Sequence, residues 1–313
     1  MENIIEVQEL TKSYGKFKAL DELSLSVEKG KIFGLLGPNG SGKSTTINCL
    51  LSLLNYEKGK IKIFGKELTP ESYDIKSKIG VVFQDVAVFD ELTVYENIDY
   101  FCGLYIEDKQ KRKNYVGEAL KLTGLEEFIK FRPKQLSGGL LRRLNIACGI
   151  SHKPELIFLD EPTVAVDPQS RNAILEGIKQ LNKKGATIVY TTHYMEEVEQ
   201  LCNRIVIIDK GKIIAEGTKE ELKESIILGE KITLEVLNLS NDLINNINKL
   251  EDVISVKKED NTIFITYKKG EEHLEKLVDF MKNNSIKYSK LFSELPSLND
   301  VFLELTGKEL RDN

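Results

Sequence analysis

A stretch of nine residues has the composition and spacing that bind a chain of phosphates. From Gly37 to Thr45 it reads Gly-Pro-Asn-Gly-Ser-Gly-Lys-Ser-Thr, which fits the pattern G-x-x-x-x-G-K-S/T at every required position. The glycines allow a tight turn with inward N–H groups, and a helix starting at about Lys43 points its positive dipole end at the phosphates. Lys43 adds charge, and Ser44 offers a hydroxyl to Mg2+. We therefore predict a nucleoside triphosphate site made by Gly37, Pro38, Asn39, Gly40, Ser41, Gly42, Lys43, Ser44 and Thr45.

An ordinary Gly-rich turn can match this pattern by chance, so the flanking sequence must distinguish such a turn from a phosphate-binding loop. Residues Ile32 to Leu36 form a short apolar run typical of a buried strand, and Thr45 to Leu54 continues as a predicted helix. Strand, loop and helix in this order are the setting that a phosphate-binding loop requires. The context favours the nucleotide site over a plain turn.

Two acidic residues follow a second predicted strand. Leu156 to Leu159 lacks polar alternation, as expected for a strand buried on both faces of a mostly parallel sheet, and Asp160 and Glu161 come directly after it. Ligand contacts in such sheets lie at the carboxyl ends of the strands. We expect Asp160 to hold Mg2+ and Glu161 to orient and polarise the water that attacks a γ-phosphate. A strand end capped by two solvated acids would use the same residues.

Ser137, Gly138 and Gly139 precede a predicted helix at Leu140 to Ile150. The hydroxyl and the free N–H groups at such a helix start suit a γ-phosphate. The same geometry serves an ordinary helix N-cap with two permissive glycines. On these residues alone the plain N-cap is the better interpretation.

His193 and Gln84 each follow a predicted strand, at 186–191 and 79–83 respectively. Their place at strand ends favours contact with the γ-phosphate or transition state for His193, and with Mg2+ or the attacking water for Gln84. The alternatives are a structural histidine and a strand-terminal polar residue. His152 and His273 lack such a context, and we expect them at the surface or at a domain boundary.

These residues need a framework that brings several strand ends together. Asn3 to Leu10 and Leu23 to Val27 alternate apolar and polar residues, which predicts an antiparallel hairpin with a turn at Thr11 to Gly15. Strands and helices then alternate to about Ser225, which predicts an α/β fold with a mostly parallel sheet and an antiparallel β layer. A helical insert is predicted at about residues 90–150, from helical spacing at 92–104, 109–123 and 125–130.

The pattern changes in the last part of the chain. The predicted elements are strand 231–237, helix 241–250, strands 252–257 and 262–268, helix 272–283 and strand 285–291. This β-α-β-β-α-β order resembles a ferredoxin-like split unit, and a last helix is predicted at Ser297 to Leu305. We therefore predict two domains, 1–225 and 226–313, the second a small α+β module for interaction or dimerisation.

Bulk composition excludes several classes of protein. The 313 residues carry a net charge of −5, so the chain lacks the basic excess of a general nucleic-acid binder, and we expect no nucleic-acid partner. No signal peptide pattern is present at the N-terminus, and no run approaches the roughly 18 apolar residues of a membrane span. The cysteines form no C-x-x-C pair, which indicates reduced core residues; they are Cys49, Cys102, Cys148 and Cys202.

Taken together, these segments resemble the nucleotide-binding subunit of ABC transporters. The resemblance covers about residues 3–222 and rests on Gly37–Thr45, Gln84, Leu136-Ser137-Gly138-Gly139, Leu156–Glu161, Asp167 and His193. It implies ATP and Mg2+ as cofactors and ATP hydrolysis as the activity. Catalytic roles fall to Lys43, Gln84, Glu161 and His193, and metal contacts to Ser44, Gln84 and Asp160. It further implies that Tyr14 stacks on adenine and that Asp167 joins two active sites.

The resemblance also implies two partners. One is a second ABC ATPase, in a homodimer or heterodimer where Ser137, Gly138 and Gly139 of one subunit close over the ATP bound by Lys43 of the other. The second is an integral membrane permease subunit, to which Gln84 would link the metal site. The expected location is cytoplasmic, peripheral on the inner face of the membrane.

Some residues depart from the family pattern. Leu140 stands where the signature commonly has Gln, and Val164-Ala165-Val166 stands where many members have Ser-Gly-Leu, so closure of the dimer could be weakened or tuned. The tail from Leu295 to Gly307 resembles the C-terminal extension of ATP-binding subunits from bacterial drug, antibiotic and polysaccharide exporters. We therefore expect export, of a substrate that this chain does not specify.

Two other functions compete with this one. A soluble ABC protein acting on ribosomes usually has two cassettes in one chain, and one acting on DNA usually has a long coiled coil; neither feature is visible. A small GTPase would need an Asn-Lys-x-Asp motif, and Asn182-Lys183-Lys184-Gly185 lacks the Asp.

Overall fold

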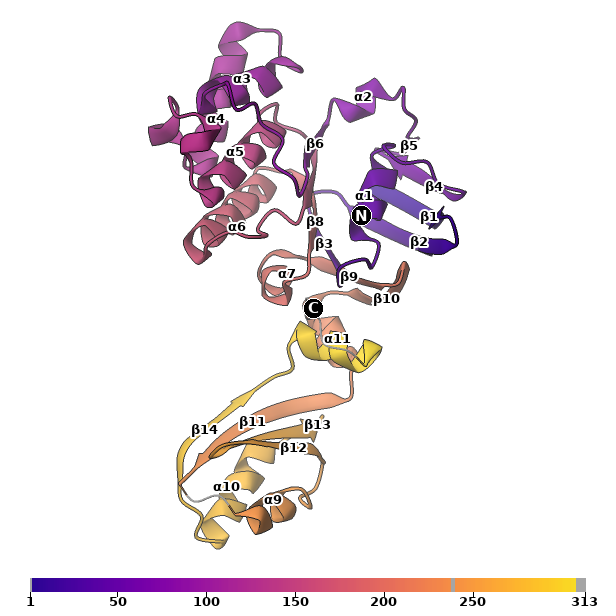
Figure 1. Cartoon of the computed structure of the whole chain (residues 1–313). Helices are drawn as coiled ribbons and strands as arrows, with labels where there is room; N and C mark the ends of the chain where they lie inside the picture. Colours follow the sequence, from indigo (N-terminus) through magenta and orange to yellow (C-terminus); the bar gives the residue numbers. More distant parts are fainter. Residues whose placement is uncertain (1, 238–239, 308–313) are drawn as a thin grey trace. The chain divides into compact units, whose positions relative to one another are not determined.

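The computed structural model describes residues 2–237 and 240–307 (Figure 1). By the density of its internal contacts, the chain divides into two units that meet between Lys219 and Glu220, at the start of helix α8 (Lys219–Ser225). The predicted division near Ser225 lies at the other end of this helix, and as a functional boundary it stays a prediction. The two units have separate hydrophobic cores.

The central sheet of the N-terminal unit has six strands in the order β10-β9-β3-β8-β7-β6. Five run parallel, and β10 pairs antiparallel with β9. Every residue of β3 and β7 is buried, which explains their nearly continuous apolar sequences. The strands are β3 (Ile32–Leu36), β6 (Ile79–Val82), β7 (Leu156–Asp160), β8 (Thr187–Thr192), β9 (Arg204–Asp209) and β10 (Lys212–Gly217).

A smaller antiparallel sheet has the order β2-β1-β4-β5. Its strands are β1 (Asn3–Tyr14), β2 (Phe17–Glu28), β4 (Lys58–Ile63) and β5 (Lys66–Glu67). The predicted hairpin is confirmed, but β1 continues to Tyr14, so the turn predicted at Thr11 to Gly15 is wrong over most of its length. Register shifts near Leu10 and Lys12 interrupt the apolar alternation there, which is why the pattern resembled a strand end.

Helix α1 (Lys43–Leu50) contacts both sheets and shares one core with them. In Figure 1, α1 and the antiparallel sheet lie on one side of the parallel strands, and α4, α5 and α6 lie on the other. The helix ends at Leu50 rather than at the predicted Leu54, because Ser52 adopts a left-handed conformation with φ of 53°. A short helix, α2 (Tyr73–Lys76), follows β5.

Three helices form a second core within the N-terminal unit: α3 (Val94–Gly103), α4 (Lys109–Thr123) and α5 (Gly138–Ile150). Their starts are encoded locally, since Thr93 forms a capping box with Glu96 and Ser137 caps α5. The helix predicted at 125–130 is only the 3-10 turn η1 (Glu126–Phe128), followed by η2 (Pro133–Gln135). Helices α6 (Pro168–Lys183) and α7 (Met195–Leu201) complete the unit.

The C-terminal unit has a four-stranded antiparallel sheet in the order β12-β13-β11-β14. Along the chain its elements follow the predicted β-α-β-β-α-β order. They are β11 (Leu228–Val236), α9 (Asn241–Ile247), β12 (Val253–Glu259), β13 (Thr262–Lys268), α10 (His273–Asn283), β14 (Tyr288–Glu294) and the last helix α11 (Leu298–Thr306). Together the units bear out the predicted class, an α/β cassette followed by a small α+β module.

The four cysteines are buried free thiols, as predicted. The expected surface positions of His152 and His273 are wrong, because these side chains are only 8% and 1% exposed. Each stacks on a tyrosine ring, His152 on Tyr105 and His273 on Tyr267. In the part of the chain that the structure describes, no helix is long and apolar enough to cross a membrane.

Candidate active site

The loop at Gly37 to Thr45 links β3 to α1 at the carboxyl edge of the parallel sheet. Two glycines are required by its geometry. A Cβ atom at Gly37 would collide with the Ile208 carbonyl oxygen, and Gly42 has φ of 112° with the Ala19 carbonyl oxygen 2.8 Å from where a Cβ atom would lie. The backbone of this loop therefore approaches its neighbours more closely than a larger residue would allow.

A pocket of about 270 Å³ opens at this loop. Its lining unites nine predicted residues from the loop, β1, and the ends of β6 and β7: Tyr14, Asn39, Gly40, Gly42, Lys43, Ser44, Thr45, Gln84 and Glu161. Phe17 and Ala19 complete it, and the sequence analysis missed both. Phe17 pairs with Tyr14 across the hairpin and is 59% exposed, so hairpin register was the signal that could have found it.

Lys43 and Glu161 both line this pocket and are in contact with each other. Lys43 Nζ lies 3.2 Å from Glu161 Oε1 and donates hydrogen bonds to the carbonyl oxygens of Gly37 at 2.8 Å and Pro38 at 3.3 Å. The side chains of Lys43 and Glu161 are only 6% and 5% exposed. The ion pair is not aligned as a hydrogen bond, so Glu161 Oε1 is buried with no hydrogen-bond donor among the described residues. A buried carboxylate oxygen with spare acceptor capacity is suited to binding a polarised water or hydroxyl.

His193 lies on the other side of Glu161, with Nδ1 2.8 Å from Oε2. The backbone of Glu161 is held to β8, because its N–H group donates to the carbonyl and the hydroxyl oxygens of Thr191. Glu161 itself has φ of 49°, a left-handed conformation that is rare for a residue with a side chain. The strand ends therefore hold Lys43, Glu161 and His193 in one contiguous arrangement.

Asp160 is 5% exposed and accepts a 2.5 Å hydrogen bond from the Thr191 hydroxyl through Oδ1. It does not appear in the lining of the pocket at Lys43, whereas Ser44 and Gln84 do. Carboxylate, hydroxyl and amide oxygens are the donor types that Mg2+ accepts. The residues present at this edge therefore fit the chemistry of a magnesium ion bound with a nucleotide.

Glu197 on α7 connects the loops that carry Glu161 and His193. Its carboxylate is buried, and Oε2 accepts hydrogen bonds from the hydroxyls of Thr163 at 2.9 Å, Tyr190 at 2.7 Å and Thr192 at 3.1 Å. Arg171 Nε lies 3.5 Å from Oε1. Thr163 is two residues after Glu161, and Thr192 directly precedes His193. The sequence analysis missed Glu197, because nothing in its local pattern separates it from the neighbouring solvated acid Glu196.

Ser137, Gly138 and Gly139 do not line the pocket at Lys43. The Ser137 hydroxyl caps α5 by accepting from the Leu140 N–H group at 3.3 Å. Gly139 packs against the start of α6, so that a Cβ atom there would overlap Ser170 and lie 2.9 Å from Asp167 Oδ2, whereas Gly138 faces open space. Asp167 caps α6, and the hydrogen bond from the Ser170 N–H group lowers the pKa of its carboxyl.

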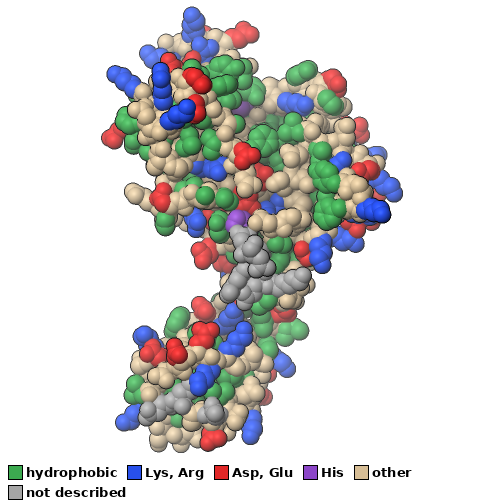
Figure 2. Space-filling model, viewed as in Figure 1, with side chains coloured by type: hydrophobic (Ala, Val, Ile, Leu, Met, Phe, Trp, Pro, Cys, Tyr) green, Lys and Arg blue, Asp and Glu red, His purple; other side chains and the backbone are tan. Residues whose placement is uncertain are grey.

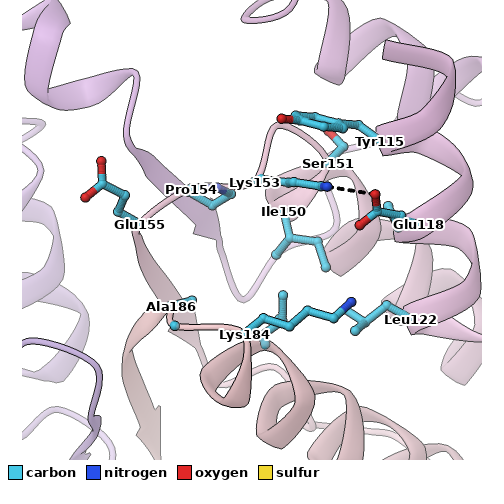
Figure 3. Close-up of a pocket in the computed structure, with 13 residues that line it drawn as sticks. Tyr115, Glu118, Leu122, Ile150, Ser151, Lys153, Pro154, Glu155, Lys184 and Ala186 are labelled. Atoms are coloured by element: carbon cyan, nitrogen blue, oxygen red, sulfur yellow. Dashed lines mark hydrogen bonds and ion pairs between the residues drawn. The ribbon is translucent and has the colours of Figure 1, made fainter. Parts of the chain in front are cut away.

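A different pocket, of about 340 Å³, lies at the amino ends of β7 and β8 (Figure 3). Figure 3 shows Tyr115, Glu118 and Leu122 of α4 on one side, and Lys153, Pro154 and Glu155 on the chain entering β7. Lys153 pairs with Glu118 at 2.7 Å. This pocket has no Gly-rich turn, and it lies at the edge opposite to the one where parallel sheets bind ligands. The loop carrying Lys43 is therefore the better candidate for the nucleotide site.

Comparison with known proteins identifies the family of this chain. Residues 20–164 match the family model described as "ABC transporter", and residues 217–306 match one described as "ATP-binding protein DrrA1-3-like, C-terminal domain". The chain is 40% identical over 311 residues to the linearmycin resistance ATP-binding protein LnrL of Bacillus subtilis, covering 99% of this chain and 100% of that protein. It is 33% identical to the daunorubicin resistance ATP-binding protein DrrA3 of Streptomyces coeruleorubidus, covering 98% and 97%. With the Nod factor export ATP-binding protein I of Cupriavidus metallidurans it shares 34% identity over the full length of both.

Solved structures give the same result for the N-terminal unit. The ATP-binding subunit of an ABC transporter superposes with a TM-score of 0.65 at 27% identity, covering 71% of this chain and 92% of that one. A dimeric ATP-binding cassette in a post-hydrolysis state, bound to ADP and phosphate, superposes with a TM-score of 0.63 at 29% identity, covering 68% and 98%. With its phosphate-binding loop, its paired strand-end acids and its full-length relatives, this chain belongs to the ATP-binding proteins of ABC transporters and is an ATPase.

Proposed function

We propose that this chain binds and hydrolyses Mg-ATP and thereby drives a separate membrane permease in export. The observation that carries the chemistry is the contiguous contact of Lys43, Glu161 and His193 beside the loop pocket. Support for export comes from relatives over the whole chain, whose names are those of resistance and export proteins. The proposed location is cytoplasmic, peripheral on the inner face of the membrane.

Each residue of the site has a proposed role. The N–H groups of the loop and the Lys43 ammonium hold the phosphates, while Tyr14 offers its half-exposed ring to adenine. Ser44, Gln84 and Asp160 would hold Mg2+, which when bound neutralises charge on the phosphates. Glu161 accepts a hydrogen bond from the attacking water, and His193 keeps the Glu161 carboxylate oriented through its 2.8 Å contact.

A complete site would require two copies of the cassette. Ser137, Gly138 and Gly139 lie outside the pocket that contains Lys43, and Gly138 faces open space. They would therefore reach the γ-phosphate of an ATP bound by a second ABC ATPase, of the same or another kind. A relative of known structure is a dimeric cassette, which supports this arrangement. Hydrolysis removes the group that both subunits contact, so the dimer can act as a two-state switch.

An exposed aromatic cluster is the proposed contact with the permease. The rings of Phe89, Tyr100 and Phe101 lie 5.0 to 5.9 Å apart, and Phe89 and Tyr100 are 42% and 48% exposed. Exposed apolar groups of this size are typical of interaction surfaces. Phe89 of this cluster is five residues after Gln84, so the segment 84–89 connects the cluster to the pocket residue Gln84.

Buried polar side chains of the helical core hold the segment 84–89 in place. Arg142 donates to the Gln84 carbonyl oxygen at 2.5 Å, Asn145 accepts from the Ala87 N–H group at 3.0 Å, and Asn97 accepts from the Phe89 N–H group at 2.8 Å. A rigid connection between the nucleotide pocket and an exposed patch is what transmission of force to a permease requires.

The decisive test is turnover of Mg-ATP by the purified chain. We expect Glu161→Gln to retain ATP binding and lower kcat by about 100-fold or more, because the amide cannot accept the proton of the water. Ser137→Arg should also leave ATP binding intact but stop dimer formation and hydrolysis. Turnover by the unaltered chain no faster than by Glu161→Gln would contradict the proposal, as would co-purification with ribosomes or DNA in place of a membrane protein.

A further inference from the structure

The C-terminal sheet has one covered face and one open face. Helices α9 and α10 lie on one side of it in Figure 1, and their apolar residues pack on Ile232, Leu234, Ile263, Ile265 and Tyr267. Side chains on the opposite face are exposed or half-buried, including two large aromatic residues. Phe264 is 37% exposed and Phe292 is 57% exposed. The open face is therefore a mostly polar surface with two exposed aromatic rings, and no second layer of the described residues covers these rings.

Strand register arranges the open face in three rows, each crossing β12, β13, β11 and β14 in that order. The middle row contains both aromatic rings together with one lysine and one threonine. Its residues are Lys257, Phe264, Thr233 and Phe292. One outer row is Ser255, Thr266, Lys231 and Glu294, and the other is Glu259, Thr262, Glu235 and Lys290.

The charges on this grid determine which kind of partner fits. The three rows of the open face contain three lysines and three glutamates, so the net charge of this face is zero. A surface for nucleic acid or for an anionic membrane needs an excess of Lys and Arg. Figure 2 likewise shows charges of both signs interspersed on the visible face of this unit. Two exposed aromatic rings within a balanced set of charges are typical of a protein interface.

We propose that this open face binds the same face of a second copy of the chain, about a two-fold axis along the middle row. Rotation about that axis exchanges the two outer rows. Lys290 of one copy then faces Glu294 of the other, Lys231 faces Glu235, and the rings of Phe264 and Phe292 face their own counterparts. On β11 and on β14, each charged side chain of one copy therefore faces a side chain of opposite charge in the other copy. This is the self-complementarity that a two-fold interface requires.

Contacts within one chain are compatible with this pairing. Lys290 lies 3.0 Å from Glu235, and Lys231 contacts Asp300 of α11. The second copy adds Glu294 beside Lys290, so charges of opposite sign meet on β11 and β14, while Lys257 on the edge strand β12 lies in the middle row and faces its own counterpart. Two antiparallel sheets packed face to face lie about 10 Å apart, which leaves room for the aromatic rings between them. This contact does not depend on ATP, so it can be tested apart from the proposed function.

The test uses the full chain without nucleotide and a cysteine on the axis. Burial raises the pKa of Cys49 to about 11, and it also raises the pKa of the thiols of Cys102, Cys148 and Cys202, so the native cysteines react poorly with maleimides. Thr233→Cys should be linked to its own counterpart by a short bis-maleimide. Lys276→Cys, on the helix-covered side in α10, is the matched control and should remain unlinked.

Two sets of second-site changes sharpen the result. In the Thr233→Cys background, Phe264→Ser with Phe292→Ser should weaken self-association about tenfold or more in sedimentation, since aromatic anchors dominate such interfaces. Lys290→Glu should weaken it, and adding Glu294→Lys should restore it. Persistence of linking in a Lys43→Ala background would support the interface independently of ATP binding.

Three outcomes would overturn this inference. They are equal linking of Thr233→Cys and Lys276→Cys, absence of linking at Thr233→Cys, and linking of Thr233→Cys in cells to a membrane protein in place of a second copy. The last result would assign the open face to the permease.

Discussion

The two edges of the parallel sheet differ in how deeply their ion pairs are buried. At the carboxyl edge, Lys43 and Glu161 are in contact with side chains only 6% and 5% exposed. At the amino edge, Lys153 and Glu118 also pair, but their side chains are 43% and 50% exposed. A buried ion pair costs desolvation and is retained where its chemistry is used, whereas an exposed pair is screened by water and contributes little. The buried ion pair therefore distinguishes the candidate active site at the carboxyl edge from the ordinary surface at the amino edge.

This difference follows from the direction of the strands. All parallel strands end at the same edge, so the residues after β3, β6, β7 and β8 converge there. Helix α1 begins at that edge and directs its positive end into the same space. The amino edge collects the ends of helices and the chain segments that enter the strands, as in the pocket of Figure 3.

The largest expected effect is at Lys43. Lys43→Ala should weaken ATP binding about 100-fold or more, because it removes the charged donor beside the phosphates. Its counterpart at the amino edge, Lys153→Ala, should leave ATP affinity unchanged and alter stability by less than about 1 kcal/mol. Titration with a fluorescent ATP analogue measures the first quantity, and thermal unfolding measures the second. Equal losses of affinity in both variants would break the comparison.

Glu197 is expected to have the next largest effect, on catalysis rather than on binding. Glu197→Ala removes the acceptor that ties Thr163 to Thr192, so Glu161 and His193 lose their alignment and kcat should fall about 10- to 100-fold. KM for ATP should change about twofold or less, because Glu197 does not line the pocket. Steady-state kinetics separates these quantities.

Two variants control the Glu197 experiment. Glu197→Gln retains an acceptor oxygen and should recover part of the lost kcat, and the exposed neighbour Glu196→Ala should behave like the unaltered protein. If Glu197→Ala lowers the melting temperature but not kcat of the folded protein, the positioning role is wrong and Glu197 is only structural.

A smaller effect is expected where α5 starts. Gly139→Ala should destabilise the fold by about 1 to 3 kcal/mol, because the new methyl group overlaps Ser170 and α5 must shift away from α6. Gly138→Ala introduces its methyl group into open space and should leave the unfolding temperature nearly unchanged. Denaturant unfolding of both variants tests this. Similar destabilisation by both alanines would show that the packing against α6 is not what requires Gly139.

The smallest effect is a pH dependence at the amino edge. Burial lowers the pKa of His152 below its ordinary value of 6.5. The unfolded chain then binds more protons than the folded chain between the two pKa values, so the stabilisation is complete above pH 6.5 and declines as the pH falls through that window. The loss is at most about 1.4 kcal/mol per pH unit.

His152→Phe keeps an aromatic ring for stacking on Tyr105 and removes the titration. Its free energy of unfolding should therefore vary less between pH 7 and pH 5 than that of the unaltered protein. ATP hydrolysis at pH 7.5 should be the same in both, since His152 lies at the sheet edge opposite to the loop carrying Lys43. An identical pH dependence in the variant would assign the titration to other groups.

Much of this protein was readable from its sequence. The phosphate loop follows from residue types at fixed spacing, because only glycines tolerate the close approaches at Gly37 and Gly42. The buried strands β3 and β7 follow from apolar runs, and the start of α5 follows from the capping preference of Ser137. These features depend on interactions within a few residues, so the local pattern carries them.

Only the tertiary structure decided the remainder. The contact of Glu161 with both Lys43 and His193 and the hydrogen bonds that Glu197 accepts each join residues from different elements. The same holds for the open face of the C-terminal sheet, where Phe264 and Phe292 share a row only through the register of three strands. Sequence spacing sets which face of a strand a side chain occupies, but strand order and register determine its neighbours, and these arise from the packing of the whole domain.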